Sequence, residues 1–140
     1  MDARLKRMGT AMPRILIVDD DERLTKIIGD YLSIFGFEPE LASSAAQARN
    51  CLKRGTYAVV LSDFRMPGES GLDLLTHIKS KYPGLPFILM TGLPSSTLRR
   101  IAMELGSNAF IEKPFELKDL VKTIETVLTP ADGETMSMAS

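Results

Sequence analysis

Three carboxylates, one hydroxyl and one ammonium group each follow a short apolar run of this sequence. They belong to Asp19, Asp20, Asp63, Thr91 and Lys113. Carboxylates held close together repel one another, so a cation or a proton must neutralise them. Oxygen ligands of this kind suit Mg²⁺. An aspartate beside Mg²⁺ and a lysine is a plausible nucleophile for phosphoryl transfer. If the fold brings these groups together, the sequence predicts an aspartyl phosphate.

The elements that must position these groups are visible in the hydrophobic pattern. The apolar runs are continuous rather than alternating, which is typical of strands covered on both faces; they span residues 15–18, 57–61, 87–90 and 109–111. Segments with helical periodicity separate them, at 24–32, 44–54, 72–78, 98–105 and 117–128. Residues 37–42 form a weaker strand, which Pro39 would confine to a sheet edge.

This alternation of strands and helices predicts an α/β fold. Five strand–helix units imply a doubly wound parallel sheet with helices on both faces. With the weak second strand at an edge, the natural strand order is 2-1-3-4-5. Ligands bind such sheets outside the carboxyl ends of the strands, near the point where strand order reverses. The five chemical groups are therefore expected to converge there, although each one alone is as readily explained by a turn or a helix cap.

Four segments resemble the motifs of bacterial response-regulator receiver domains. They read "ILIVDDDER", "LSDFRMPGESGLDLL", "ILMTG" and "IEKPF", and the resemblance extends from Pro13 to Thr129. The spacings agree as well, with 28 residues from Asp63 to Thr91 and 22 from Thr91 to Lys113. Any one motif can occur by chance, but all four appear in order and each lies at a strand end. The resemblance implies a flavodoxin-like five-stranded fold and a signalling switch of a two-component system.

The resemblance also implies roles for individual acidic residues. Asp63 would be the phosphoacceptor, Asp20 would bind Mg²⁺ directly, and Asp19 would do so through water. Asp63 and the backbone carbonyl of Arg65 would complete the protein ligands of the ion, so the Arg65 side chain is free to differ among relatives.

The remaining implied roles concern transfer and output. Thr91 would hydrogen-bond a phosphoryl oxygen, and Lys113 would pair first with Asp63 and then with the phosphoryl group. A cis Lys113–Pro114 bond is expected to aim the ammonium group at the site. Phe110 occupies the aromatic switch position, where many relatives have Tyr. Together with Thr91 it would alter the face formed by residues 94–128, where a downstream protein or a second copy would bind.

Two other functions compete with the switch. A receiver-fold binding module that works without phosphorylation would be expected to lack an acidic or lysine position, and none is lost here. A Mg²⁺-dependent aspartyl phosphohydrolase would need a different Asp-x-Asp context, whereas Asp19 and Asp21 are followed by Arg23, and no cap insert is evident. The expected partner is a histidine kinase or phosphotransfer protein. No enzymatic activity is expected beyond the chain's own phosphoryl transfer and autodephosphorylation.

Bulk properties limit the remaining possibilities. The 140 residues carry a net charge of −1, which gives no general attraction to nucleic acid or an anionic membrane. The single cysteine, Cys51, suits a reducing compartment, and no apolar stretch approaches a bilayer span. We expect a cytoplasmic protein with a leader over residues 1–12, one receiver domain over 13–129 and a disordered tail over 130–140.

Overall fold

The fold alternates strands and helices along the whole described chain. In this computed structural model, residues 12–93 and 95–129 are described. The elements are β1 (Arg14–Val18), α2 (Glu22–Ile34), β2 (Glu38–Ala42), α3 (Ala45–Arg54), β3 (Val59–Asp63), α4 (Gly71–Lys81), β4 (Phe87–Thr91), α5 (Ser96–Glu104), β5 (Ala109–Glu112) and α6 (Leu117–Leu128). Apart from Met12, the expected leader and tail lie outside the described residues. None of the helices in this part of the chain is long and apolar enough to cross a membrane.

The five strands form one parallel sheet in the order β2-β1-β3-β4-β5, which confirms the predicted topology. The weak second strand is real and lies at the edge, where Pro39 faces Ile15 across the ladder that joins β2 to β1. A proline fits at an edge because one side of the strand needs no ladder donor.

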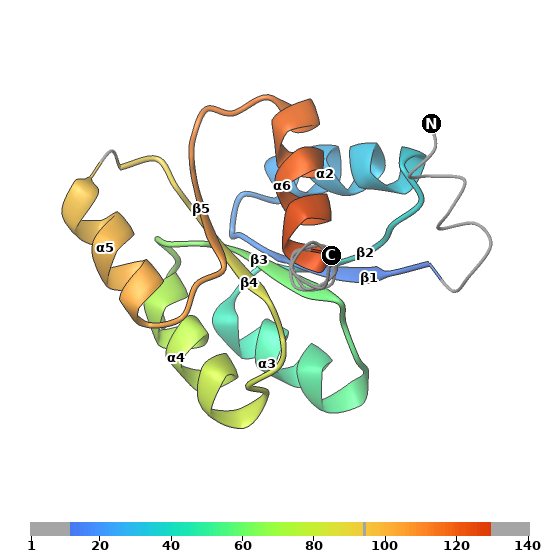
Figure 1. The fold of residues 1–140 in the computed structure, drawn as a ribbon. Helices are drawn as coiled ribbons and strands as arrows, with labels where there is room; N and C mark the ends of the chain where they lie inside the picture. The colour runs from blue at the N-terminus through green and yellow to red at the C-terminus, as the bar shows by residue number, and fades with distance from the viewer. Residues whose placement is uncertain (1–11, 94, 130–140) are drawn as a thin grey trace, which may run out of the picture.

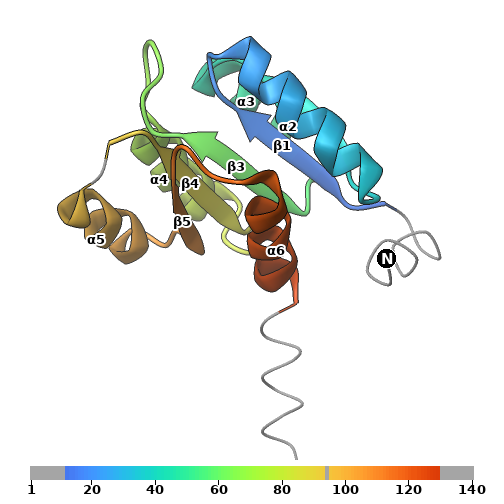
Figure 2. The same ribbon diagram turned by 90° about the horizontal axis from the view of Figure 1, so that it is seen from above.

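Helices cover both faces of the sheet, with α2 and α6 on one face and α3, α4 and α5 on the other (Figures 1 and 2). Successive strand residues point to opposite faces. Leu16, Val18 and Leu89 pack toward α3, α4 and α5, while Ile17 and Ile88 pack toward α2 and α6. Both faces are buried, which explains why the apolar runs of the sequence are continuous.

Local signals fix the helix ends. The Asp21 side chain caps α2 by accepting a hydrogen bond from the Leu24 N–H at 3.1 Å. Ser95 caps α5 in the same way, with its hydroxyl accepting a hydrogen bond from the Leu98 N–H at 3.0 Å. Gly36 and Gly106 have φ angles of 89° and 108°, a region that glycine enters without steric cost, so each lets the chain leave its helix.

Three strands reach further than the apolar pattern predicted. The strands β3, β4 and β5 end at Asp63, Thr91 and Glu112, beyond the predicted ends at residues 61, 90 and 111, and β3 begins at Val59 instead of Tyr57. The parallel ladder continues through polar residues because its bonds join backbone groups; Asp63 pairs with Met90, and Thr91 with Glu112. The sheet therefore holds the backbone of both site residues rigidly.

Candidate functional site

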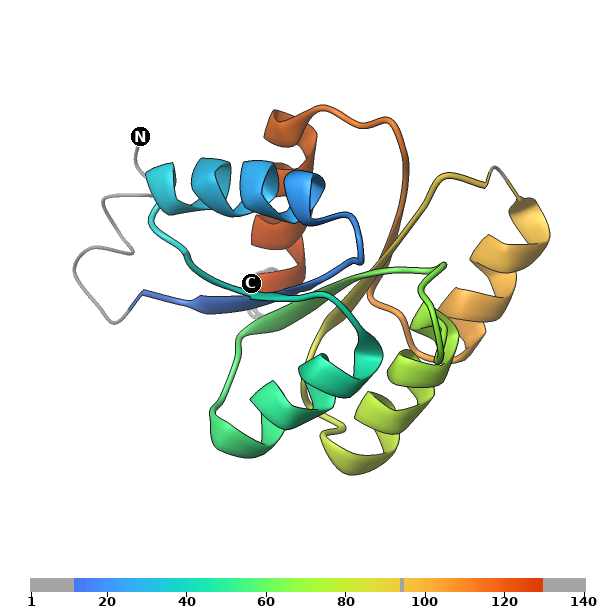
Figure 3. The same cartoon turned by 180° about the vertical axis from the view of Figure 1, so that it is seen from behind.

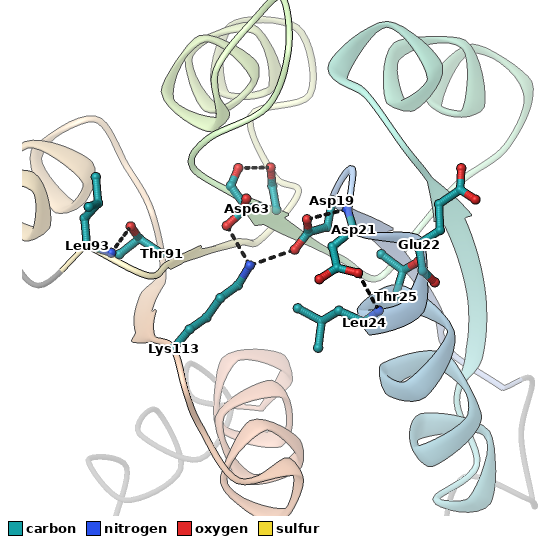
Figure 4. A network of polar contacts seen from close by, with 10 residues as sticks. Asp19, Asp21, Glu22, Leu24, Thr25, Asp63, Thr91, Leu93 and Lys113 are labelled. Atoms are coloured by element: carbon teal, nitrogen blue, oxygen red, sulfur yellow. Dashed lines mark hydrogen bonds and ion pairs between the residues drawn. The ribbon is translucent and has the colours of Figure 1, made fainter.

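The structure brings the predicted acidic and basic groups together at the carboxyl edge of the sheet. Asp19 and Asp20 directly follow β1, Asp63 ends β3, and Lys113 follows β5. Figure 4 shows the Lys113 side chain reaching from the β5 side to lie between Asp19 and Asp63. This is the convergence that the strand order predicted.

Lys113 bridges two carboxylates. Its Nζ lies 2.9 Å from Asp19 Oδ2 and 2.9 Å from Asp63 Oδ1. Burial raises the pKa of Asp63, against the hydrogen bond from Lys113, and the charge of Asp19 raises it further. Burial alone would lower the pKa of Lys113, but its hydrogen bonds to Asp19 and Asp63 outweigh that effect and the pKa is raised. Lys113 therefore stays protonated and holds Asp63 in place.

Three carboxylates form an acidic cluster. One oxygen each from Asp19, Asp20 and Asp63 lies within 4.8 Å of the others. Asp19 and Asp63 are buried, whereas Asp20 is exposed. The two Asp19 oxygens already accept hydrogen bonds, from the Asp21 N–H at 3.0 Å and from Lys113. With one ammonium group among three carboxylates, two negative charges remain, and this charge and the hard oxygen donors fit a divalent cation such as Mg²⁺.

Thr91 and the groups around it form an open pocket beside Asp63. The pocket has a volume of about 280 Å³ and is lined by Asp63, Arg65, Thr91, Gly92, Leu93 and Lys113. The Thr91 side chain is buried, and its Oγ1 accepts a hydrogen bond from the Leu93 N–H at 2.9 Å, toward which it points in Figure 4. Sequence reasoning placed Thr91 and Arg65 here but missed Leu93. The only available signal for Leu93 was its position two residues after Thr91.

The loop after β5 aims Lys113 at the site. The Lys113 N–H donates to the Thr91 carbonyl at 2.7 Å, which continues the β4–β5 ladder by one bond. The Lys113–Pro114 peptide bond is cis, as predicted.

Phe110 lies outside the pocket. It sits in β5 opposite Leu89 and is 8% exposed. Its ring packs into the core cluster that includes Leu98 and Ala102 of α5, and the Arg99 guanidinium lies 5.3 Å from the ring centroid. The ring is thus already buried beneath α5, and its role as a switch stays a prediction.

A further residue shapes the site from behind. A Cβ on Gly71 would lie 2.3 Å from the Asp63 carbonyl oxygen and 3.0 Å from the Phe64 Cα. The backbone of α4 therefore passes too close to the end of β3 for any side chain. Sequence reasoning did not single out this glycine, although a glycine directly after the Ser70 cap was a visible signal.

Comparison with known sequences agrees with the geometry. A model of the response regulator receiver domain family matches residues 15–125. Protein PetR of Rhodobacter capsulatus is 34% identical over 121 residues, covering 86% of this chain and 51% of PetR. The transcriptional regulatory protein FixJ of Bradyrhizobium diazoefficiens is 33% identical over 130 residues, covering 93% of this chain and 63% of FixJ. The chain therefore spans about half to two thirds of the length of these two relatives.

Solved structures show the same similarity. The non-phosphorylated HemR receiver domain from Leptospira biflexa superimposes with a TM-score of 0.78 at 34% identity, over 84% of this chain and 94% of that one. The beryllofluoride-activated NtrC4 receiver domain dimer gives a TM-score of 0.81 at 29% identity, over 85% and 98%. With the family match over most of its length and the acidic pocket at the expected sheet edge, the chain belongs to the response regulator receiver domain family.

Proposed function

We propose that the protein is a phosphorylation-activated switch that accepts a phosphoryl group onto Asp63 from a histidine kinase or a phosphotransfer protein. One observation carries the proposal: Asp63 and Asp19 share the Lys113 ammonium group, and Asp63 and Lys113 also line an open pocket. A structural ion pair would need only one carboxylate, and it would not need a neighbouring acidic residue left exposed.

The positions of these groups support the following transfer. An Asp63 carboxylate oxygen forms a new bond to phosphorus while the bond from phosphorus to the donor breaks, and the donor leaves with that electron pair. Lys113 then exchanges its contact with the Asp63 oxygen for one with a phosphoryl oxygen. The Thr91 hydroxyl, released from Leu93, donates to another phosphoryl oxygen. Dephosphorylation is a separate step: water attacks phosphorus, the bond to Asp63 breaks with its electron pair returning to the carboxylate, and inorganic phosphate leaves as the attacking water gives up a proton to solvent.

The acidic cluster would hold Mg²⁺ through Asp19, Asp20 and Asp63, together with the Arg65 carbonyl. When bound, the ion would neutralise charge on the transferring phosphoryl oxygens. The exposed Asp20 carboxylate is the best placed for direct ligation, because both Asp19 oxygens are already engaged.

The output would leave through the face formed by residues 94–128. Phe110 lies under this face, and Arg99 covers its ring. The chain would act on a downstream protein or pair with a second copy, and the similar NtrC4 receiver domain forms a dimer in its beryllofluoride-activated state. It would act as a signalling protein, with no nucleic acid bound by this part of the chain and no catalysis beyond its own phosphoryl transfer and hydrolysis. Its cytoplasmic location stays a prediction.

The direct test is labelling with acetyl phosphate. In the presence of Mg²⁺ the wild-type protein should gain one acid-labile phosphoryl group by mass spectrometry, and Asp63→Asn should gain none. Asp30→Asn, which alters an exposed carboxylate on α2, is the matched control and should be labelled normally. Omission of Mg²⁺ should abolish labelling. Equal labelling of the Asp63 variant would show that Asp63 is not the nucleophile. An unlabelled wild type would favour a binding module that works without phosphorylation.

A further inference from the structure

The loop between Asp63 and α4 is anchored at both of its ends. This β3–α4 loop, residues 64–70, carries the Arg65 carbonyl that is proposed to bind Mg²⁺. Backbone bonds fix its base: the Phe64 N–H donates to the Met90 carbonyl, and the Gly71 N–H donates to the Phe64 carbonyl, both at 2.8 Å. At the other end, Ser70 and Asp73 form a reciprocal capping box. Between these anchors, Arg65, Pro67 and Gly68 are exposed.

One charged contact reaches this loop from a neighbouring helix. An Arg49 guanidinium nitrogen on α3 donates to a Glu69 carboxylate oxygen, with 34% and 40% of the two side chains exposed. The Arg49 Nε is buried and has no hydrogen-bond partner in the described structure. The inner part of the side chain is therefore shielded from solvent, and a terminal nitrogen reaches Glu69.

The helix that carries Arg49 is a firm base. Four of its side chains, Ala45, Ala48, Cys51 and Leu52, are buried in the same core cluster as Leu74 and Leu75 of α4. Both helices lie on one face of the sheet (Figure 3). The ion pair thus ties the loop beside Asp63 to a packed element that carries no residue of the acidic site.

We propose that Arg49 is a positioning residue of the phosphorylation site, which acts through Glu69 to hold the β3–α4 loop and its Arg65 carbonyl in place. The part that concerns Mg²⁺ rests on the proposed function, whereas the part that concerns the loop does not. Loss of either charge frees the loop tip without removing any of its backbone anchors. A partly exposed ion pair is a modest restraint, worth about a two- to fivefold change in a local equilibrium.

Hydrogen exchange measured by mass spectrometry on the metal-free protein tests the restraint. Arg49→Met and Glu69→Met each keep an aliphatic stem while removing one charge. Each should speed exchange in a peptide covering residues 64–70 by about two- to fivefold, with residues 45–54 unchanged. Because the two residues act as a pair, the double variant should exchange no faster than either single variant. Arg100→Met, which breaks an exposed ion pair with Glu104 on α5, is the control and should leave this loop unchanged.

Mg²⁺ titration by calorimetry tests the link to the site. Arg49→Met should bind Mg²⁺ about two- to fivefold more weakly than the wild type, and Arg100→Met should bind it normally. Unchanged exchange in 64–70, additive effects in the double variant, or faster exchange throughout 45–54 would each overturn the positioning role. Altered loop exchange with unaltered Mg²⁺ affinity would overturn the link to the ion. A wild type that binds no Mg²⁺ would reject the metal site of the proposed function, and the exchange data would still decide whether Arg49 holds the loop.

Discussion

At the level of single residues, the fold places Asp63, the proposed nucleophile, where burial disfavours its charged form. Burial raises the pKa of Asp63, with repulsion from Asp19 in the same direction, although Lys113 opposes both. At pH values between the unfolded pKa of 3.8 and the raised pKa of the folded state, Asp63 binds more protons in the folded protein than in the unfolded chain. The free energy of unfolding contributed by this group therefore falls as pH rises through that window. Above it, the charged carboxylate imposes its full cost on the fold.

Asp63→Asn should consequently stabilise the metal-free protein at pH 7.5. The amide is uncharged, so it avoids the cost of burying the carboxylate, while Lys113 keeps its contact with Asp19. The midpoint of urea unfolding should be higher for the variant at pH 7.5, and the difference should shrink as pH falls toward 4. A variant less stable than the wild type at pH 7.5 would show that the contact with Lys113 outweighs the burial of the charge.

Removal of the shared cation should have the opposite effect. Lys113→Met leaves Asp19 and Asp63 facing each other without the ammonium group that now lies 2.9 Å from each. We expect the metal-free variant to lose about 1–3 kcal/mol in the free energy of unfolding, and added Mg²⁺ to restore part of it. Lys118→Met, which removes an exposed pair with Glu116, is the control and should change stability by about 0.5 kcal/mol or less. Equal effects of the two substitutions would mean that Lys113 contributes no more than a surface charge.

At the level of elements, the close approach of α4 to the end of β3 controls where Asp63 sits. Gly71→Ala puts a methyl group 2.3 Å from the Asp63 carbonyl oxygen, and a backbone atom cannot move aside as a flexible side chain can. We expect a loss of roughly 1–3 kcal/mol in the free energy of unfolding and slower phosphorylation by acetyl phosphate. The control is Gly84→Ala beyond the other end of α4, because a Cβ there meets nothing within 4 Å. Similar stability and rate in both variants would contradict the contact.

The elements also show how far the sequence alone leads. The apolar runs predicted four of the five strands because both faces of the sheet are buried, and Pro39 placed the weaker fifth strand, β2, at the edge. The pattern could not predict that β3 extends to Asp63, because backbone ladders continue without regard to side-chain polarity. Nor could it show that Lys113 contacts Asp19 as well as Asp63, or that Arg49 meets Glu69, because those contacts join side chains from separate elements. The residue types were visible in the sequence, whereas the pairings needed coordinates.

At the level of the whole molecule, the proposed signal has to pass from Asp63 across β4 to β5 and α5. Thr91 ends β4 beside the pocket, and Phe110 lies in the neighbouring strand with its ring under Leu98 and Ala102 of α5. A phosphoryl group would add charge that attracts the Thr91 hydroxyl away from Leu93. A change at the β4–α5 connection would then pass to the packing of α5 over Phe110, and so to the face that contains Arg99.

Substitution of Phe110 should separate chemistry from output. Phe110→Ala would remove the ring entirely and cost about 3–5 kcal/mol, so Phe110→Leu is the better probe because it keeps an apolar side chain but loses the aromatic surface that Arg99 covers. Asp63 should still be phosphorylated at close to the wild-type rate, since the ring does not line the pocket. Beryllofluoride should change hydrogen exchange across residues 91–115 in the wild type but much less in the variant.

Phe37→Leu is the control because it alters a buried aromatic residue in the other core cluster, and it should respond like the wild type. Equal responses in all three proteins would mean that the signal leaves the site without passing through Phe110. If the exchange changes in the wild type were confined to the loops around Asp20 and Asp63, output through the face formed by residues 94–128 would be excluded.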